Sequence, residues 1–548
     1  MQGSRVKNSS RNILFSMIAY IVQIVLGFIV RRYFIYYFCE EYLGINSVFS
    51  NILSLLSLAE LGFGTAIVFA MYKPMADDDK EKVRQLLQFY KKCYTIIGLI
   101  VLGIGLMVFP FMYYFKSKVS NIDVNFYVVY SIYLFNSVVS YFFSYRRSLL
   151  YTSQRNDIES KVNLIINIFS SLLQVLILFT IRNYYIYLSV SGIAQILNNA
   201  IIFFITEKKY GDYTKKPQSV LDKKTVKEIN KNIFAMIYHK IGTAIVYSTD
   251  SLIIYFMFGS STLGKYSNYL LITTYVTSMI AIITNAIKGS VGNSIASETS
   301  EKNYHLFKKL NFFYMWIVSF CSISIFILSD PFIDIVLTKN PQTNLLFNRV
   351  IITLISLNFL FSVSRYLCGT FKECAGLFYQ DRFKPLFEAL INLVVSIILS
   401  FKWGLAGVVL GTIVSSITTG VWVEPFVLYK YYFKKSCKEY FLKYLWFVIV
   451  AIVSGVGTYY LCNLIPSSNL LNLIIKFIIC AIIPNCFLLL LLFWIPEFKD
   501  NFRFAKNLLL SLLKKQKKSK ENNHEITENL DKNNTKGEEN NPIVDSDK

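Results

Sequence analysis

The amino-acid sequence predicts an all-α polytopic membrane protein that crosses a bilayer about fourteen times. Apolar side chains make up 54% of its 548 residues and charged side chains only 16%, whereas a soluble protein carries about 25% charged residues. The mean hydropathy is +0.45. The apolar residues are grouped into runs of roughly 20, the length with which a helix spans the hydrocarbon core. Open strands would leave backbone groups unpaired in lipid, so each run is expected to be helical.

The runs define the predicted spans in chain order. The first run follows basic residues, as in a signal peptide, but no small-residue cleavage site follows and it continues into Arg31 and Arg32, so we interpret it as a retained span. The seam between the eleventh and twelfth runs at Trp403–Gly404 is tight, which leaves twelve or thirteen spans as the alternative count. The runs lie at residues 12–31, 46–71, 93–115, 126–145, 162–181, 185–206, 233–258, 266–287, 311–329, 350–367, 386–401, 404–428, 444–462 and 470–494.

The cations are placed in the way that membrane orientation requires. The formal net charge is +22 with 56 Lys and Arg residues, which by itself would indicate nucleic-acid binding. About 44 of the 56 lie in alternate gaps between the runs, and this positive-inside pattern indicates a membrane protein with both termini in the cytoplasm and no nucleic-acid partner. The basic gaps are residues 1–11, 72–92, 146–161, 207–231, 288–310, 368–385, 430–443 and 495–548.

An internal repeat appears at an offset of 220 residues. Residues 11–94 set over residues 231–314 without a gap give 15 identities in 84 positions. Chance matches among Ile, Leu and Phe inflate this count, but charged, glycine and asparagine positions also agree. An even number of spans per repeat gives both copies the same orientation, so we expect two six-helix lobes with a cavity between them. The matching pairs include Asn12/Asn232, Leu43/Leu263, Gly44/Gly264, Ser47/Ser267, Glu81/Glu301 and Lys82/Lys302.

The repeat and the charge pattern together give a domain organisation. The tail from about Lys514 is rich in Lys, Asn and Glu, has almost nothing to bury, and is expected to be disordered. The predicted parts are an N-lobe of spans 1–6 (residues 1–210), a basic cytoplasmic linker (211–232), a C-lobe of spans 7–12 (233–430), spans 13 and 14 (431–495) and a cytoplasmic tail (496–548).

Enzyme motifs are absent from the sequence. The nine cysteines have no metal-ligand or redox spacing. The three histidines are His239 within a span, His305 in a basic loop and His524 in the tail. No phosphate-binding glycine loop, zinc motif or nucleophile elbow occurs, and the predicted external loops are short. We therefore expect no enzyme, no metal site and no resident cofactor.

Charged side chains at membrane depth are the first candidate site, because each costs several kcal/mol unless it faces a wet or paired interior. They are Glu60 in span 2 and His239, Lys240 and Asp250 in span 7. One helical stripe carries Lys240, Thr243, Tyr247 and Asp250. Lys240 and Asp250 lie about 15 Å apart along the axis, too far for a direct pair. One alternative is structural, with Glu60 paired to Lys240 and Asp250 acting as a cap. The other is functional, with an anion on Lys240 and proton or sodium coupling at Glu60 and Asp250.

Polar stripes on spans 2 and 8 are the second candidate. Hydroxyls commonly serve helix packing in lipid, but their occurrence in both halves slightly favours one shared hydrophilic cavity. Basic residues at cytoplasmic helix ends are the third candidate. Topology alone explains most of them, although a pyrophosphate head group would need such donors where it enters. The stripe residues are Ser47, Asn51, Ser54 and Ser57 with Ser267, Thr274, Thr277 and Asn285, and the basic residues are Arg146, Arg147, Lys288, Arg365 and Lys372.

Several segments resemble one known family. LGINSVFSNILSLLSLAELGFGTAIVFAMYKP at Leu43–Pro74, HKIGTAIVYSTDSLIIYFMFG at His239–Gly259, LGKYSNYLLI at Leu263–Ile272 and GLAGVVLGTIVSS at Gly404–Ser416 resemble bacterial polysaccharide-unit flippases of the O-antigen and capsule type. These belong to the multidrug/oligosaccharidyl-lipid/polysaccharide (MOP) exporter superfamily, which includes the MATE transporters. The likeness runs from about residue 8 to residue 440 and rests on loose apolar motifs.

The resemblance implies a fold and a function. The fold is two six-helix lobes with spans 13 and 14 beside the second. The function is to flip undecaprenyl-pyrophosphate-linked oligosaccharide to the outer leaflet of the bacterial cytoplasmic membrane by alternating access, for capsule, exopolysaccharide or O-antigen synthesis. It implies cavity roles for Glu60, Lys240 and Asp250, and less strongly for Arg31 or Arg32, with proton or sodium coupling. Glycosyltransferases and a polymerase of the same pathway are the implied protein partners.

Three other functions stay open at this stage. A lipid II flippase and a drug/cation antiporter belong to the same superfamily, and an antiporter would favour acidic and aromatic cavity residues over Lys240. A polysaccharide polymerase or ligase belongs to a different class and would place its essential residues in external loops.

Overall fold

The computed structural model describes most of the chain. It covers residues 2–498 except 61–62, 120–121, 154, 339–343, 378, 468 and 494–497. Within these ranges side chains are described from residue 17 onward, except at residues 59, 65, 231–232, 234–240, 243, 247 and 286. Every regular element in the described ranges is a helix, as the apolar runs predict. The predicted tail beyond Phe498 lies outside the described residues.

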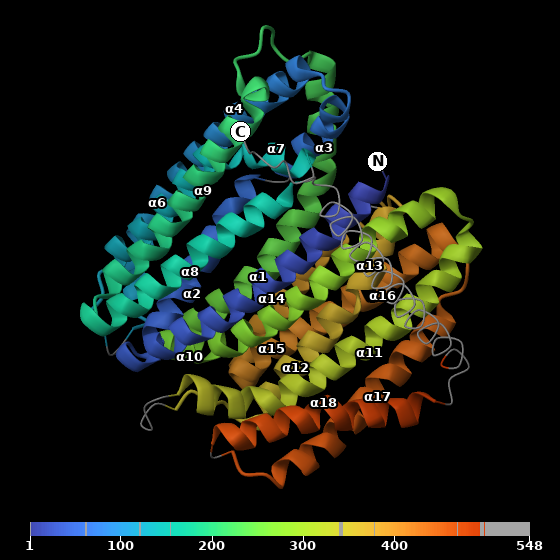
Figure 1. Ribbon diagram of the computed structural model, residues 1–548. Coiled ribbons are helices and arrows are strands. Elements are labelled where there is room, and N and C mark those ends of the chain that lie inside the picture. The colour runs from blue at the N-terminus through green and yellow to red at the C-terminus, as the bar shows by residue number, and fades with distance from the viewer. Residues whose placement is uncertain are drawn as a thin grey trace, which may run out of the picture.

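The first half of the chain forms one group of helices (Figure 1). Asparagine side chains begin two of them, because Asn125 and Asn183 accept hydrogen bonds from the first free backbone N–H groups of α6 and α9. The elements are α1 (Gln2–Tyr37), α2 (Glu40–Leu56), η1 (Ser57–Glu60), α3 (Phe63–Ala76), α4 (Lys80–Val108), η2 (Phe109–Phe111), α5 (Met112–Lys116), α6 (Phe126–Ser144), α7 (Arg147–Thr152), α8 (Asn156–Thr180) and α9 (Tyr184–Thr214).

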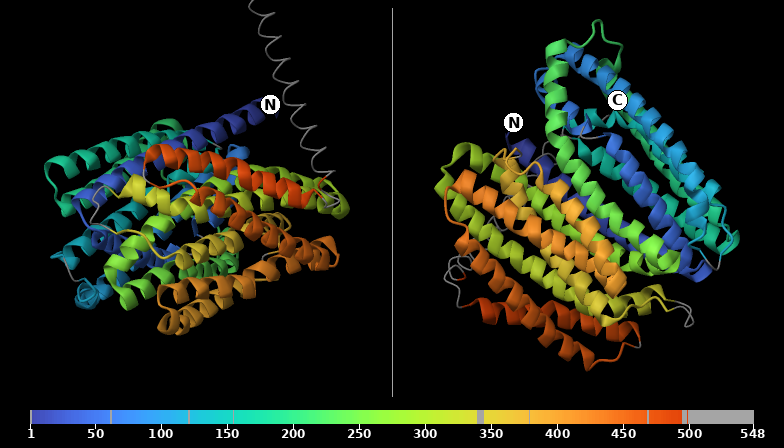
Figure 2. Two further views of the ribbon diagram at one scale, coloured as in Figure 1. Left: turned by 90° about the horizontal axis from the view of Figure 1, so that it is seen from below. Right: turned by 180° about the vertical axis from the view of Figure 1, so that it is seen from behind.

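The second half forms a second group beside the first (Figures 1 and 2). Helices α17 and α18 lie on the flank of this group farthest from the first, where Trp316 of α11 donates a hydrogen bond to Asn485 of α18. The elements are α10 (Lys223–Ser297), α11 (Ser300–Phe332), η3 (Ile333–Leu337), α12 (Arg349–Ser364), α13 (Tyr366–Cys374), α14 (Lys384–Trp403), α15 (Leu405–Ser415), η4 (Ser416–Gly420), α16 (Val421–Val427), η5 (Leu428–Phe433), α17 (Lys438–Asn463) and α18 (Leu470–Leu492).

Twelve helices in the described part of the chain are long and apolar enough to cross a membrane, so the chain is a multi-pass membrane protein. The predicted count of fourteen stays a prediction. The span predicted at 46–71 is divided among α2, η1 and α3. The spans predicted at 233–258 and 266–287 both lie within α10, on either side of Gly259, whose φ of +84° interrupts the helical backbone.

The short junction predicted at Trp403–Gly404 is a turn between two helices, where the chain reverses direction. Gly404 has a φ of +59°, a conformation that glycine adopts at low cost, and it separates α14 from α15. Gly407 and Gly411 then lie directly against the backbone of Leu399 and Ser396, where a Cβ atom would overlap. Small residues at this spacing bring the two helices close together.

The two groups meet where α2 crosses α10. A Cβ atom on Gly44 would overlap the carbonyl group of Ser260, and one on Gly264 would overlap the carbonyl group of Glu40. These residues form two pairs separated by 220 residues, which is the repeat offset in the sequence. From this crossing the groups diverge toward the end of the bundle where α1 begins (Figure 1). We call that end the basic end.

The segment between α9 and α10 is fixed to the first group at the basic end. Glu81 accepts hydrogen bonds from the backbone N–H groups of Gln218 and Ser219 at 2.7 and 3.3 Å. Its repeat partner Glu301 pairs with Lys435, at 2.9 Å, just after η5. In each half, the repeat-related glutamate therefore binds the segment that follows the last helix of that half. The predicted boundaries of the lobes and linker stay predictions.

Candidate functional site

Asp250 lies at the centre of a polar cluster that joins three helices of the second group. Its carboxylate accepts a hydrogen bond from the amide of Asn392 on α14 at 3.2 Å and from the hydroxyl of Thr412 on α15 at 2.6 Å. Asn392 also donates to Thr412, at 3.1 Å, and accepts from Thr249 at 3.1 Å. Asn392 is completely buried. The recorded partners of Asp250 among the described side chains are therefore neutral.

This cluster presents oxygen ligands around one negative charge. A carboxylate inside a membrane protein is costly without compensation, and an amide and a hydroxyl supply only dipoles. A proton or a small hard cation such as Na⁺ would supply the missing positive charge, since hard cations prefer carboxylate, carbonyl and hydroxyl oxygens. The coupling role expected for Asp250 stays a prediction.

A second polar cluster lies nearer the basic end of α14. Glu388 pairs with Arg365 at 2.7 Å and with Lys384 at 3.0 Å. Lys384 also pairs with Glu424, at 2.7 Å, and Lys372 pairs with Asp381. Three cations face three carboxylates, and every side chain in the cluster is at most 14% exposed. The charges of this cluster compensate one another, whereas the partners of Asp250 among the described side chains are neutral.

Buried polar residues connect the two clusters along α14. Lys384, Glu388, Asn392, Ser396 and Ser400 follow one another at intervals of four residues and therefore share one face of the helix. All five face the protein interior. The face runs from the charged cluster past Asp250 toward Gly404.

Glu60 lies in the first group, at the break between α2 and α3. It accepts a hydrogen bond from the hydroxyl of Tyr94 on α4, and the rings of Tyr90 and Tyr94 stand edge to face with centroids 4.4 Å apart. A Cβ atom on Gly64 would lie within about 3 Å of both tyrosine hydroxyls, so the glycine admits this contact. Glu60 is thus bound by Tyr94 of its own group, and Tyr90 packs against that tyrosine. A pairing with Lys240 stays untested.

Arg31 and Arg32 bridge the two groups. Arg31 of α1 donates to Asn268 of α10 at 2.9 Å and to Ser267. Arg32 donates to the backbone carbonyls of Ile335 and Val336 in η3 at 3.2 and 2.8 Å. Ser267 belongs to the polar stripe predicted on span 8, so one residue of that stripe contributes to contact between the groups.

The predicted polar stripes lie outside the packed core. Ser54 and Thr274 are exposed, and Ser57 and Thr277 are partly exposed. The hydroxyl of Ser57 donates to the carbonyl of Ser54 at 2.6 Å, a local contact within the helix. These positions are consistent with a common hydrophilic cavity, which stays a prediction.

The five predicted head-group donors each have a carboxylate partner. The pairs are Arg146–Glu207, Arg147–Glu159, Lys288–Glu373, Arg365–Glu388 and Lys372–Asp381. A phosphate would have to compete with these carboxylates, so the proposed entry role requires an exchange of partners. The side chains of His239, Lys240, Thr243 and Tyr247 lie outside the described residues, and their roles stay predictions.

The sequence reasoning missed Asn392, Thr412, Glu388 and Glu424 as site residues. Each is a polar residue inside an apolar run. The usable signal was the four-residue spacing of Glu388, Asn392, Ser396 and Ser400 on one predicted span. Such spacing places polar groups on a single helical face.

The fold resembles that of several solved membrane transporters. Lipid II flippase MurJ in an inward closed conformation matches with a TM-score of 0.62 and 17% identity over 88% of this chain and 99% of that one. An inward-facing multidrug-resistance MATE transporter of the MOP superfamily matches with a TM-score of 0.58 and 14% identity over 76% of this chain and 98% of that one. A MOP superfamily transporter from Pyrococcus furiosus matches with a TM-score of 0.54 and 13% identity over 78% of this chain and 97% of that one. The chain therefore shares the fold of these transporters.

The sequence adds a family to this fold. The family model described as "Polysaccharide biosynthesis protein" matches residues 9–287, which is half of the chain. The protein belongs to this family. No curated protein matches the sequence.

Proposed function

We propose that the protein is a flippase that carries undecaprenyl-pyrophosphate-linked oligosaccharide from the cytoplasmic to the outer leaflet. One observation carries the proposal: a polysaccharide-biosynthesis family member has two repeat-related helix groups that touch at one end and diverge toward the other. This arrangement supports alternating access, in which the groups close at one end while they open at the other. The basic end faces the cytoplasm in this proposal, with both termini on that side.

The physical need for such a protein is large. Moving a pyrophosphate and several sugars through hydrocarbon without hydrogen-bond partners costs tens of kcal/mol. A hydrophilic path between the groups removes most of that barrier while the prenyl chain stays in lipid. With the cytoplasm negative, two uncompensated negative charges moving outward gain about 4–5 kcal/mol per 100 mV. Lys240 is proposed to hold the pyrophosphate, and if it moved with the substrate it would reduce that gain.

Asp250 is proposed to couple transport to a proton or Na⁺. Its neutral partners Asn392 and Thr412 support this role, because a bound cation would complete the charge of the cluster. In proteoliposomes, Asp250→Asn should abolish the dependence of flipping on a Na⁺ or proton gradient. Asp123→Asn, in an exposed loop, is the matched control and should behave as wild type. Unchanged gradient dependence in Asp250→Asn would exclude the coupling role.

The location of the glycan distinguishes the flippase from its rivals. Cells lacking the protein should accumulate complete single repeat units on the inner leaflet. Units that reach the outer leaflet unpolymerised would instead identify a polymerase or ligase. Accumulated peptidoglycan precursor would identify a lipid II flippase. Normal glycan export by Lys240→Ala and Glu60→Gln at normal protein levels would remove these two residues from the proposed cavity.

A further inference from the structure

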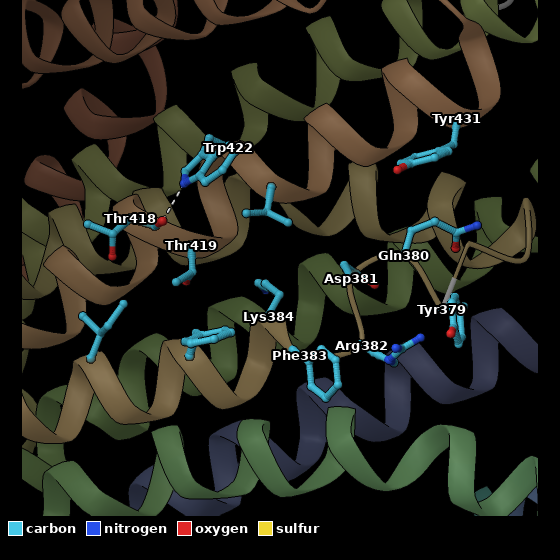
Figure 3. Close-up of a pocket in the computed structure, with 13 residues that line it drawn as sticks. Tyr379, Gln380, Asp381, Arg382, Phe383, Lys384, Thr418, Thr419, Trp422 and Tyr431 are labelled. Carbon is cyan, nitrogen blue, oxygen red and sulfur yellow. Dashed lines mark hydrogen bonds between the residues drawn. The ribbon is translucent and has the colours of Figure 1, made fainter.

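A groove of about 770 Å³ lies between the basic ends of α14 and α16, apart from the crossing of α2 and α10 (Figure 3). Arg382 and Phe383 line one side of it, and Thr418 and Trp422 line the opposite side. Phe387 extends the lining along α14. The groove thus has a polar end at the loop before α14 and an apolar end along the helix.

Arg382 gives the polar end its positive charge. Its guanidinium group stacks on the ring of Tyr379 at 3.7 Å and on that of Phe383 at 4.8 Å. Among the described residues no ion pair is recorded for Arg382, whereas Lys384 in the same lining is paired with Glu388 and Glu424. Stacking on aromatic rings leaves the N–H edges of a guanidinium available to a phosphate.

The apolar end continues into a stripe on α14. Five exposed side chains of this helix follow one another at intervals of three and four residues, which place them on one face. They carry no charge from Phe387 to Phe401, where the exposed fraction reaches 78%. A helix face this apolar and this exposed faces the acyl chains of the bilayer. The stripe is Phe387, Leu390, Val394, Ile398 and Phe401.

The opposite wall is shaped by the π-helical segment η4. A Cβ atom on Gly420 would overlap the guanidinium of Arg365, so α16 passes directly over the buried charged cluster. The wider turn places Thr418 and Thr419 in the groove lining, and Trp422 donates its indole N–H to the carbonyl of Thr418. Tryptophan is typical of the level of lipid head groups.

We propose that this groove binds an anionic phospholipid of the surrounding bilayer. The phosphate binds the guanidinium of Arg382, and one acyl chain lies along the apolar stripe of α14. Within the described part of the chain, Arg382 is the one cation of the lining without an ion pair, which matches the single charge of a phosphodiester, whereas a pyrophosphate carries at least two. The occupant is therefore a membrane lipid rather than the glycan carrier, and the proposal does not depend on the proposed function.

Native mass spectrometry of the purified full chain tests the head-group contact. Wild-type protein should retain phosphatidylglycerol in preference to phosphatidylcholine with the same acyl chains. Arg382→Ala should weaken phosphatidylglycerol binding roughly tenfold, because the charge-assisted hydrogen bonds of the guanidinium to the phosphate are lost. Arg155→Ala is the matched control: Arg155 lies in the corresponding loop of the first group and is paired with Asp157. It should leave the preference unchanged.

A second measurement on folded protein tests the chain contact. Phosphatidylglycerol with brominated chains should quench the fluorescence of Trp422 more strongly than brominated phosphatidylcholine, measured as the difference between wild type and Trp422→Phe. An unchanged lipid preference in Arg382→Ala, or equal quenching by the two lipids, would overturn the proposal. Undecaprenyl phosphate that displaces phosphatidylglycerol at equal concentration would also overturn it, because the groove would then bind the glycan carrier.

Discussion

The crossing of α2 and α10 leads to a quantitative prediction about which end of the protein is open. Gly44→Ala and Gly264→Ala each place a methyl group against a backbone carbonyl of the other helix, at Ser260 and Glu40 respectively. Overpacking of this kind costs about 1–3 kcal/mol. The cost arises only while the crossing is closed. Each variant should therefore shift the population toward the conformation opened at this end by about 5- to 150-fold.

Cys39 reports this opening, because it directly precedes Glu40 at the crossing. Burial raises the pKa of the Cys39 thiol, so labelling is slow while the crossing is closed. In a chain whose other cysteines are replaced, a membrane-impermeant maleimide applied from outside should label Cys39 faster in both glycine variants. The increase combines greater access with a larger thiolate fraction.

Gly103→Ala is the control for this prediction. Gly103 lies within α4 and has open space where a Cβ atom would stand. All three substitutions gain about 1 kcal/mol of helix propensity, so only the clash distinguishes them. Labelling of Gly44→Ala and Gly264→Ala at the wild-type rate, or an equal increase in Gly103→Ala, would refute the assignment of this crossing as a closed gate.

Three further predictions concern single contacts. Thr412→Val removes the hydroxyl that donates to Asp250, so the apparent affinity for the coupling cation should change by roughly tenfold or more, measured as transport against Na⁺ or proton concentration. Arg31→Ala removes two contacts between the groups and should increase the labelling of Cys39 several-fold. Asp222→Asn should speed amide hydrogen exchange at residues 215–222, because Lys82 no longer binds a carboxylate there. In the wild type this protection should persist from pH 7 to pH 5, since the hydrogen bond from Lys82 holds the pKa of Asp222 below its usual range. It should be lost only when the pH falls through that lowered pKa.

Each of these predictions has a control or a contrary outcome. Thr353→Val removes a hydroxyl that bonds only its own helix backbone and should leave ion dependence unchanged. Slower or unchanged Cys39 labelling in Arg31→Ala would show that Arg31 does not hold the groups together. Protection of residues 215–222 that already falls between pH 7 and pH 5 would contradict the lowered pKa of Asp222.

Much of the fold could be predicted from patterning alone. Runs of apolar residues gave the helices, because in lipid the backbone must satisfy its own hydrogen bonds. The repeat offset predicted a relation between Gly44 and Gly264, and these glycines meet the opposite helix in matching ways. The count of spans could not be resolved in the same way. Gly259 interrupts the long helix α10, and η1 interrupts the span predicted at 46–71. Apolar content does not distinguish such a break within a span from a loop between two spans.

The site was predictable only in part. Asp250 and Glu60 stood out because charges are rare in apolar runs, but their partners come from other helices. Asn392 and Thr412 lie 142 and 162 residues from Asp250 along the chain, so local spacing could not pair them. The neutral surroundings of Asp250 and the tyrosine contact of Glu60 became visible only once α14, α15 and α4 were placed.

The sequence by itself determined that the chain lies in a membrane, how its helices alternate with basic loops, and that its two halves carry a sequence repeat. The membrane location and the alternation of helices with basic loops depend on the apolar length of each segment and on the Lys and Arg content of each loop, so each segment can be assessed separately. Only the tertiary structure decided which charges are compensated and which are not. Compensation is a property of distance between side chains: Glu388 is neutralised by Arg365 and Lys384, whereas the partners of Asp250 within the described part of the chain are the neutral side chains of Asn392 and Thr412.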